Sequence, residues 1–217
     1  MVAKIVAMNH GVLGIIPGGS ANGMAKELNI PVDPIAALNI ITGGKIKSID
    51  GIRVNGKNIC LHLCDIGINA QLIKYFDEGK LRGKLGYAKM IIKTLYHKRK
   101  LTITLQSAGK VIKREAFMVV LANASKYGTG AVINPKGVSD DGIFEVVIIR
   151  KLALSELLKM LFRPGIFDPQ KIETLSATSV MLTSQHAAHF QIDGEYLGRV
   201  KVVQAQILNQ YIKIVLP

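Results

Sequence analysis

The hydrophobic pattern of the chain changes near residue 45, and the change limits the folds open to it. Before this point a continuous apolar run, "VLGII", stands among helical segments, as in a buried strand of a parallel sheet. After it, apolar and polar residues alternate, and Asn55-Gly56 is a strong hairpin signal. A second pair of strands is expected to turn at Ser107–Lys110, and helices are expected at about 84–97 and 154–162.

This pattern predicts an α+β chain. Residues 1–45 read as the remnant of an α/β nucleotide-binding domain, and residues 46–217 as a β-sandwich-like domain. A return of the last strand to the first domain is left open. In the first part, helices are expected at about 2–8, in "ANGMAKEL" and after Asp33, where Asp33 caps the helix and Pro34 occupies its first position.

The amino-acid composition limits the kinds of binding partner and the cellular compartment expected for this chain. The 217 residues carry 28 Lys and Arg against 15 Asp and Glu, a net charge of +13, which favours acidic partners such as nucleotide phosphates or an anionic membrane. With only Cys60 and Cys64, a disulfide framework is excluded and a reducing cytoplasm is expected. No apolar run approaches the roughly 20 residues that span a bilayer, so any membrane contact is expected to be peripheral.

A glycine-rich junction follows the apolar run. Gly18, Gly19, Ser20 and Asn22 lie where a strand hands over to a helix. Backbone N–H groups in such a loop, with a serine hydroxyl, can receive a phosphate. An ordinary tight turn uses the same residues, and the local pattern favours that interpretation about two to one.

Two acidic turns offer further chemistry. Asp193-Gly194-Glu195 reads as a hairpin turn, or as a carboxylate placed at a strand end to accept a proton from a hydroxyl. Asp140-Asp141-Gly142 reads as a turn, or as oxygen ligands for a hard cation whose shell is completed by water. From the residues alone, the turn is the favoured interpretation of the first segment, and both interpretations of the second stay open.

The basic stretch 79–100 holds eight Lys or Arg and no acid. A solvated helix face is the usual meaning of such a run, but the density also suits an anionic lipid surface. Nucleic acid is not expected, because no recognition motif accompanies the charge. Cys60, His62 and Cys64 lack a fourth metal ligand at suitable spacing and are expected to be core residues.

Four segments in order, "LGIIPGGSANGMAKELNIP", "RGKLGYAKMIIKTL", "VVLANASKYGTGAVINPKGVSDDGIFEVVII" and "FQIDGEYLG", resemble the bacterial diacylglycerol kinase-like lipid kinases, a family that includes sphingosine and ceramide kinases. The resemblance covers nearly the whole chain. It implies an α/β domain and a β-sandwich domain around a cleft, with ATP as phosphate donor, Mg²⁺ as cofactor and a lipid hydroxyl as acceptor.

The resemblance assigns roles residue by residue. It implies that Ser20 contacts ATP phosphate in a loop shaped by Gly18, Gly19 and Asn22. It implies that Glu195 is the general base and that Asp50 lies near the catalytic centre. A structural Mg²⁺ site would consist of Val138, Asp141 and Ile143, with Asp141 giving its carboxylate and the other two their carbonyl oxygens.

Two departures from the family pattern shape the expectations. The Gly-Gly-Asp-Gly-Thr nucleotide motif is absent from the sequence, which predicts a chain that lacks the first part of the family's α/β domain and has little activity alone. Its unpaired sheet edge could pair with another copy as a homodimer. Gly23 stands where many glycerolipid kinases have Asp, so diacylglycerol, a related lipid and a sphingoid base all stay open. A non-catalytic lipid- or membrane-binding module is the alternative function.

Overall fold

The computed structural model describes residues 2–19, 21–78, 94, 99–127, 130–152, 156, 160 and 167–217. In the first half of the chain the elements are α1 (Val2–Met8), β1 (Val12–Leu13), α2 (Gly23–Glu27), α3 (Pro34–Gly43), β2 (Lys45–Val54), β3 (Asn58–Cys60), β4 (Leu63–Gly67) and α4 (Ile68–Glu78). In the second half they are β5 (Leu101–Ser107), β6 (Lys110–Ala116), β7 (Met118–Ala122), β8 (Phe144–Ile149), β9 (Ile172–Ala177), β10 (Ser179–Ile192) and β11 (Glu195–Leu216).

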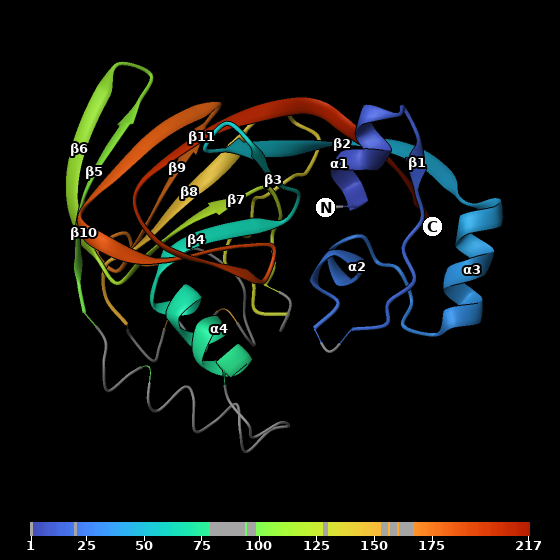
Figure 1. The fold of residues 1–217 in the computed structure, drawn as a ribbon, viewed down its shortest axis with the longest axis horizontal. Helices are drawn as coiled ribbons and strands as arrows, with labels where there is room; N and C mark the ends of the chain where they lie inside the picture. Colours follow the sequence, from blue (N-terminus) through green and yellow to red (C-terminus); the bar gives the residue numbers. More distant parts are fainter. Residues whose placement is uncertain are drawn as a thin grey trace.

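The mixed α+β class is confirmed, and most of the chain forms one 11-stranded sheet. Its order is β3-β2-β11-β10-β4-β7-β8-β9, with β5 beside β10 and β6 beside β5. All of these pairs are antiparallel. Figure 1 shows α1, α2 and α3 gathered at one end of the sheet, α4 against it and the long β5–β6 hairpin at the other end.

The long strand β11 joins the two ends of the sequence. Near its end it pairs with β1 in parallel, Val12 opposite Lys213 and Leu13 opposite Ile214, while its other edge pairs with β2. The segment that precedes α2 is therefore attached to the same strand that begins at Glu195. The division of the chain at residue 45 stays a prediction, because β2 begins there and continues this shared sheet.

Local sequence signals account for several elements. The Asp33 carboxylate accepts a hydrogen bond from the Ala36 amide at 2.8 Å and so begins α3, as expected. Asn55 and Gly56 both have positive φ, 49° and 75°, and turn β2 into β3. The predicted turn between Ser107 and Lys110 joins β5 and β6. The helices expected at about 84–97 and 154–162 lie almost wholly outside the described residues.

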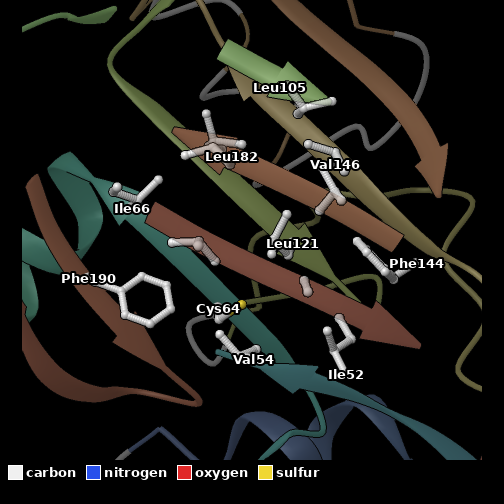
Figure 2. Close-up of a cluster of buried hydrophobic side chains, with 14 of the residues drawn as sticks. Ile52, Val54, Cys64, Ile66, Leu105, Leu121, Phe144, Val146, Leu182 and Phe190 are labelled. Carbon is white, nitrogen blue, oxygen red and sulfur yellow. The ribbon is translucent and has the colours of Figure 1, made fainter. Parts of the chain in front are cut away.

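Three apolar clusters stabilise the fold. The largest brings Phe144, Phe190, Leu182 and Cys64 together (Figure 2), and Cys60 belongs to the same cluster. A second lies on the opposite face of β4, β7 and β8, and a third fixes α1, α2 and α3 against β2 and β11. Both cysteines are buried and free, and the described residues contain no group of three His, Cys, Asp or Glu arranged for a metal ion.

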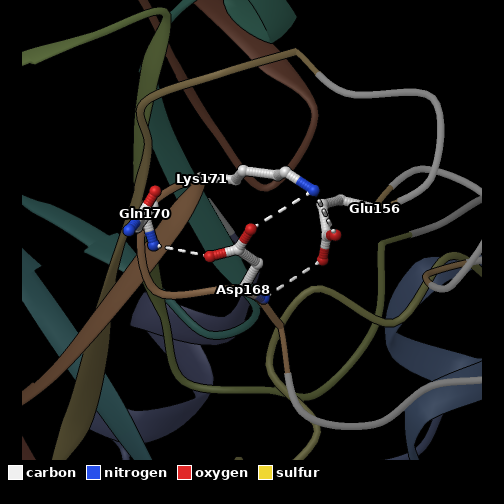
Figure 3. A network of polar contacts seen from close by, with 4 residues as sticks. All are labelled: Glu156, Asp168, Gln170 and Lys171. Carbon is white, nitrogen blue, oxygen red and sulfur yellow. Dashed lines mark hydrogen bonds and ion pairs between the residues drawn. The ribbon is translucent and has the colours of Figure 1, made fainter.

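A polar network holds the segment before β9. The Lys171 ammonium lies 3.4 Å from the Glu156 carboxylate and 3.3 Å from that of Asp168, while the Asp168 amide donates to Glu156 (Figure 3). Asp168 also accepts from the Gln170 amide at 2.9 Å. Glu156 is buried, and its contact with Lys171 offsets part of the desolvation of its charge. The network fixes how the chain enters β9.

Among the helices of the described ranges, none is long and apolar enough to cross a lipid bilayer.

Candidate functional site

The Asp193-Gly194-Glu195 segment forms the tight turn between β10 and β11. Asp193 and Gly194 have φ of 49° and 91°, which explains why a glycine stands second. Ile192 and Glu195 face each other as the last pair of the hairpin. The Glu195 side chain is exposed and makes no hydrogen bond within the described part of the chain, so its carboxylate is available to solvent or to a ligand.

Asp193 anchors this turn to the connection between β3 and β4. Its carboxylate accepts hydrogen bonds from the amides of Leu61, His62 and Leu63 at 2.9, 2.9 and 3.1 Å, and from the Cys60 thiol at 3.2 Å. Hydrogen bonds to an ionised acceptor are about twice as strong as neutral ones. The turn that carries Glu195 is therefore held on a rigid part of the sheet, although sequence analysis gave Asp193 no role.

Asp50, expected near the catalytic centre, is a buried residue in β2. Its carboxylate accepts from the Gly142 amide and the Gln210 amide, both at 2.7 Å, and its own amide donates to the Ser139 carbonyl. Its backbone carbonyl accepts from the Asn123 side chain at 2.9 Å. Asp50 thus fixes the loop before β8 against β2 and β11.

The loop fixed by Asp50 is the one expected to hold Mg²⁺. Val138 and Asp141 are exposed, and one Asp141 oxygen accepts from the Ile143 amide at 3.2 Å. The neighbouring Asp140 forms an ion pair with Lys47 at 2.9 Å, so it is committed elsewhere. A carboxylate with two backbone carbonyls is a donor set that a hard cation accepts when water completes its shell, and the role of Val138, Asp141 and Ile143 stays a prediction.

The glycine-rich junction is well defined except at Ser20, which lies outside the described residues. The Asn22 side chain accepts from the Gly19 amide at 2.8 Å, and Asn22 itself adopts a left-handed conformation just before α2. A Cβ on Gly19 would approach the Asn22 amide oxygen to 3.1 Å, whereas a Cβ on Gly18 would meet no atom within 4 Å. The Gly19–Asn22 contact draws the two sides of this loop together, and the space beside Gly18 leaves room for a ligand.

Glu27, at the end of α2, joins this junction to the rest of the site. Its carboxylate accepts from the Ser125 amide, the Ser125 hydroxyl and the Lys126 amide at 3.0, 3.1 and 3.2 Å. These donors lie in the loop after β7, 98 and 99 residues away in sequence. An isolated Glu in a short helix gave no sequence signal for this contact.

His62 and Asn123 lie between the contacts made by Asp193, Asp50 and Glu27. The Asn123 amide donates to the His62 carbonyl at 3.0 Å, and the Asn123 side chain bridges the carbonyls of Asp50 and Leu61. Burial lowers the pKa of His62, while the carboxylates of Asp193 and Glu27 act in the opposite direction. Within the described ranges, the His62 Nε2 and Asn123 Oδ1 atoms are buried without a hydrogen-bond partner. The glycine-rich segment before α2, the loop after β7 and the Asp193–Glu195 turn thus meet around one end of β4 and β7.

Asp65, in the middle of β4, is a buried acid that sequence analysis did not single out. Burial raises the pKa of its carboxyl from 3.8 to about 6, against the effect of hydrogen bonds from Asn69, Gln191 and the Ala70 amide. The sequence signal was available, because a charged residue within the apolar run "LCDIG" is seldom left unpaired in a core.

Two family models match the chain. The YegS C-terminal NAD kinase beta sandwich-like domain matches residues 63–216, and the diacylglycerol kinase catalytic domain matches residues 2–54. The first covers well over half of the 217 residues.

Proteins with similar sequences carry matching names. A diacylglycerol kinase of Bacillus subtilis is 26% identical over 220 residues, which is 96% of this chain and 70% of that protein. A diacylglycerol kinase of Staphylococcus saprophyticus is 25% identical over 88% of this chain and 64% of its own length. A probable YegS-like lipid kinase of Yersinia enterocolitica is 26% identical over 90% of this chain and 68% of its own length. The chain spans about two thirds of the length of these relatives.

Solved structures share the fold. A putative diacylglycerol kinase from Bacillus anthracis superposes with a TM-score of 0.79 at 21% identity, over 99% of this chain and 72% of the other. A second diacylglycerol kinase from that organism gives 0.73 at 18% identity, over 95% and 67%. With the domain matches and these similarities taken together, the chain belongs to the diacylglycerol kinase-like family of bacterial lipid kinases.

Proposed function

We propose that this chain carries the acceptor and base half of an ATP-dependent lipid kinase that phosphorylates the hydroxyl of diacylglycerol or a related lipid. The observation that supports this most directly is the Asp193 anchor. It holds the Asp-Gly-Glu turn on the sheet while the Glu195 carboxylate stays exposed and unbonded among the described residues. A carboxylate held in this way can serve as a general base once an alcohol is bound beside it.

In this proposal Glu195 accepts the proton of the lipid hydroxyl. The hydroxyl oxygen forms a bond to the γ-phosphorus of ATP, the bond from that phosphorus to the β–γ bridging oxygen breaks, and ADP leaves with the electron pair. An alcohol is a weak nucleophile near neutral pH, so a carboxylate within hydrogen-bonding reach assists the attack. The remaining requirements of phosphoryl transfer are alignment and neutralisation of charge.

The other predicted residues would support this transfer. Gly18, Gly19, Ser20 and Asn22 would contact the ATP phosphates, and Asp50 would hold the loop that presents Asp141 and the carbonyls of Val138 and Ile143 to Mg²⁺. That ion would be structural, and a separate Mg²⁺ bound with ATP would supply positive charge near the phosphates. The basic stretch 79–100, which lies almost entirely outside the described residues, would draw the protein to an anionic membrane, where the lipid substrate resides.

The test is the substitution Glu195→Gln in the longest natural form of the protein. It keeps the shape of the side chain and removes its basicity. Phosphorylation of diacylglycerol, ceramide and a sphingoid base in mixed micelles is followed by transfer of labelled phosphate from ATP. We expect kcat for the preferred lipid to fall by about 10²-fold with little change in KM.

Glu115→Gln is the matched control, because Glu115 is an exposed glutamate on β6 in a surface pair with Lys100. Its kcat should equal that of the unmodified protein. Equal turnover by the Glu195 variant would contradict the assignment of the base. Binding to anionic vesicles without transfer to any of the lipids, in a chain that carries Gly-Gly-Asp-Gly-Thr, would favour the non-catalytic lipid-binding alternative.

A further inference from the structure

The turn that carries Glu195 is held from a second side by Gln191. The Gly194 amide donates to the Gln191 side-chain oxygen at 2.8 Å. Gln191 lies in β10, is 2% exposed, and precedes the turn by two residues. Its buried amide oxygen therefore ties the second residue of the turn to β10.

Asp65 decides which way the Gln191 amide points. The Gln191 Nε2 group donates to the Asp65 carboxylate at 2.5 Å, so the amide oxygen must face Gly194. Asp65 is 1% exposed and also accepts from the Asn69 side chain at 2.6 Å and from the Ala70 amide at 3.0 Å. Asn69 and Ala70 belong to the first turn of α4.

We propose that Asp65 and Gln191 are positioning residues for Glu195, and that they couple the start of α4 to the Asp193–Glu195 turn. The chain of contacts runs from Ala70 and Asn69 through Asp65 and Gln191 to the Gly194 amide. It crosses 126 residues of sequence between Asp65 and Gln191. The consequence for catalysis rests on the proposed function, but the coupling itself does not and can be measured without turnover.

This series of hydrogen bonds requires the Asp65 carboxyl to be ionised. A carboxylate accepts from Ala70, Asn69 and Gln191 at once, whereas a protonated carboxyl gives up one acceptor site. Because burial raises the pKa of Asp65 to about 6, the arrangement should loosen as the pH falls through that value.

The effects of other titratable groups near these hydrogen bonds can be distinguished from the effect of Asp65. The Tyr127 phenol faces Asp65, and its pKa is raised well above 10 by burial and by the nearby Asp65 carboxylate, so it stays neutral in this range. His189 belongs to β10 and lies near Tyr196, Arg199, Lys74 and Glu78. Burial and the two cations lower its pKa. His62 lies beside Asp193 with a lowered pKa. The two histidines are therefore the groups to control.

The first measurement is made on unmodified residues 1–217. The ¹⁵N and ¹H shifts of the Gly194 amide are followed by nuclear magnetic resonance from pH 4.5 to 8. We expect a transition with a midpoint near 6 that persists in His189→Gln and His62→Gln. The amides of Gly56 and Gly109, which lie in distant turns, should not follow it. A Gly194 amide without this transition, or one whose transition disappears with either histidine, would overturn the proposal.

The second measurement exchanges the two side chains. Asp65→Asn places an amide donor against the Gln191 donor, and Gln191→Glu places two carboxylates against each other. The double variant, Asp65→Asn with Gln191→Glu, restores the pairing in reverse, because the new amide at position 65 can donate to the new carboxylate at position 191, which still accepts from the Gly194 amide. Each single variant should lose about tenfold or more of the hydrogen-exchange protection at Gly194, and the double variant should regain most of it.

A double variant no better protected than either single one would overturn the coupling. In the longest natural form of the protein, the single variants should lower kcat more than KM, and the double variant should recover kcat. Coupling at Gly194 without any lipid phosphorylation by the unmodified protein would instead reject the proposed function and leave the coupling intact. The Glu115→Gln variant again serves as the surface control.

Discussion

At the scale of single residues, the fold buries the carboxyl group of Asp65, and burial disfavours its ionised form. Asp65 is enclosed between β4, α4 and β10, and burial raises its pKa from 3.8 to about 6. Three hydrogen-bond donors reduce this effect without removing it. A hydrophobic residue of similar size would avoid the cost of desolvation but could not set the orientation of Gln191.

This burial predicts a dependence of stability on pH. Between pH of about 4 and 6 the folded state binds more protons at Asp65 than the unfolded state does, so its contribution to stability falls as the pH rises through this window. Relative to Asp65→Asn, the unmodified protein should lose about 2 kcal/mol of unfolding free energy between pH 4 and pH 7. Urea unfolding of both proteins at several pH values measures the difference.

Other titrating groups should cancel in that comparison, because both proteins share them. His62, whose pKa is lowered by burial, acts in the opposite direction: it reduces stability as the pH falls below its unfolded value. Two unfolding curves that stay parallel across the whole range would show that Asp65 has the same proton affinity in both states.

At the scale of elements, α2 is too short to be stable alone, and its position depends on contacts at both ends. Ala25 and Leu28 pack into the cluster beside β2 and β11, and Glu27 binds the loop after β7. The five residues of α2 follow directly from the glycine-rich junction. The contact of Glu27 therefore sets where that junction lies relative to the rest of the site.

Glu27→Ala should release this attachment. The substitution leaves the Ser125 and Lys126 amides without their partner, and we expect about 1–3 kcal/mol lower stability. Hydrogen exchange at residues 23–28 should rise more than exchange in β7 and β8. Glu115→Ala, which removes an exposed surface pair, should cost no more than about 1 kcal/mol. Equal exchange at α2 in both variants would show that packing alone holds the helix.

At the scale of the whole molecule, apolar side chains are unevenly exposed. Val2, Ile5 and Met8 on α1 are 65%, 54% and 70% exposed, and Val12 and Ile16 beside them are 41% and 51% exposed. Many of the other large exposed apolar residues also lie before residue 47. Large exposed apolar patches are usually covered by protein or lipid, and these side chains lie on α1 and close to β1 in sequence.

The nucleotide half of the site leads to a prediction about activity. Residues 1–217 contain no Gly-Gly-Asp-Gly-Thr segment, and the proposed phosphate contacts are limited to a short loop whose Gly19 amide donates to the Asn22 side chain. We expect residues 1–217 to transfer phosphate from ATP to lipid at least about tenfold more slowly than a longer chain with that segment. Rates of lipid phosphorylation at equal protein concentration test this, and equal rates would require a complete nucleotide site within residues 1–217.

The local signals of the sequence determined individual elements well. The Asp33 cap, the Asn55-Gly56 turn and the Ser107–Lys110 turn depend on chemistry within a few residues, and each is confirmed where it was expected. The alternation of apolar and polar residues after residue 45 likewise predicted a β-sandwich-like region, and most of that region forms strands. The order of four short segments indicated the family, which the domain matches confirm.

Only the tertiary structure decided how these elements meet. The parallel pairing of β1 with β11, the anchoring of 61–63 by Asp193, the attachment of α2 by Glu27 and the contact of Gln191 with Asp65 join residues about 98 to 200 positions apart. Hydrophobic periodicity indicates which face of a strand is buried, but it does not predict which strand pairs with it. An acid in a turn, a helix or an apolar strand therefore reveals its role only when the fold brings its donors within reach.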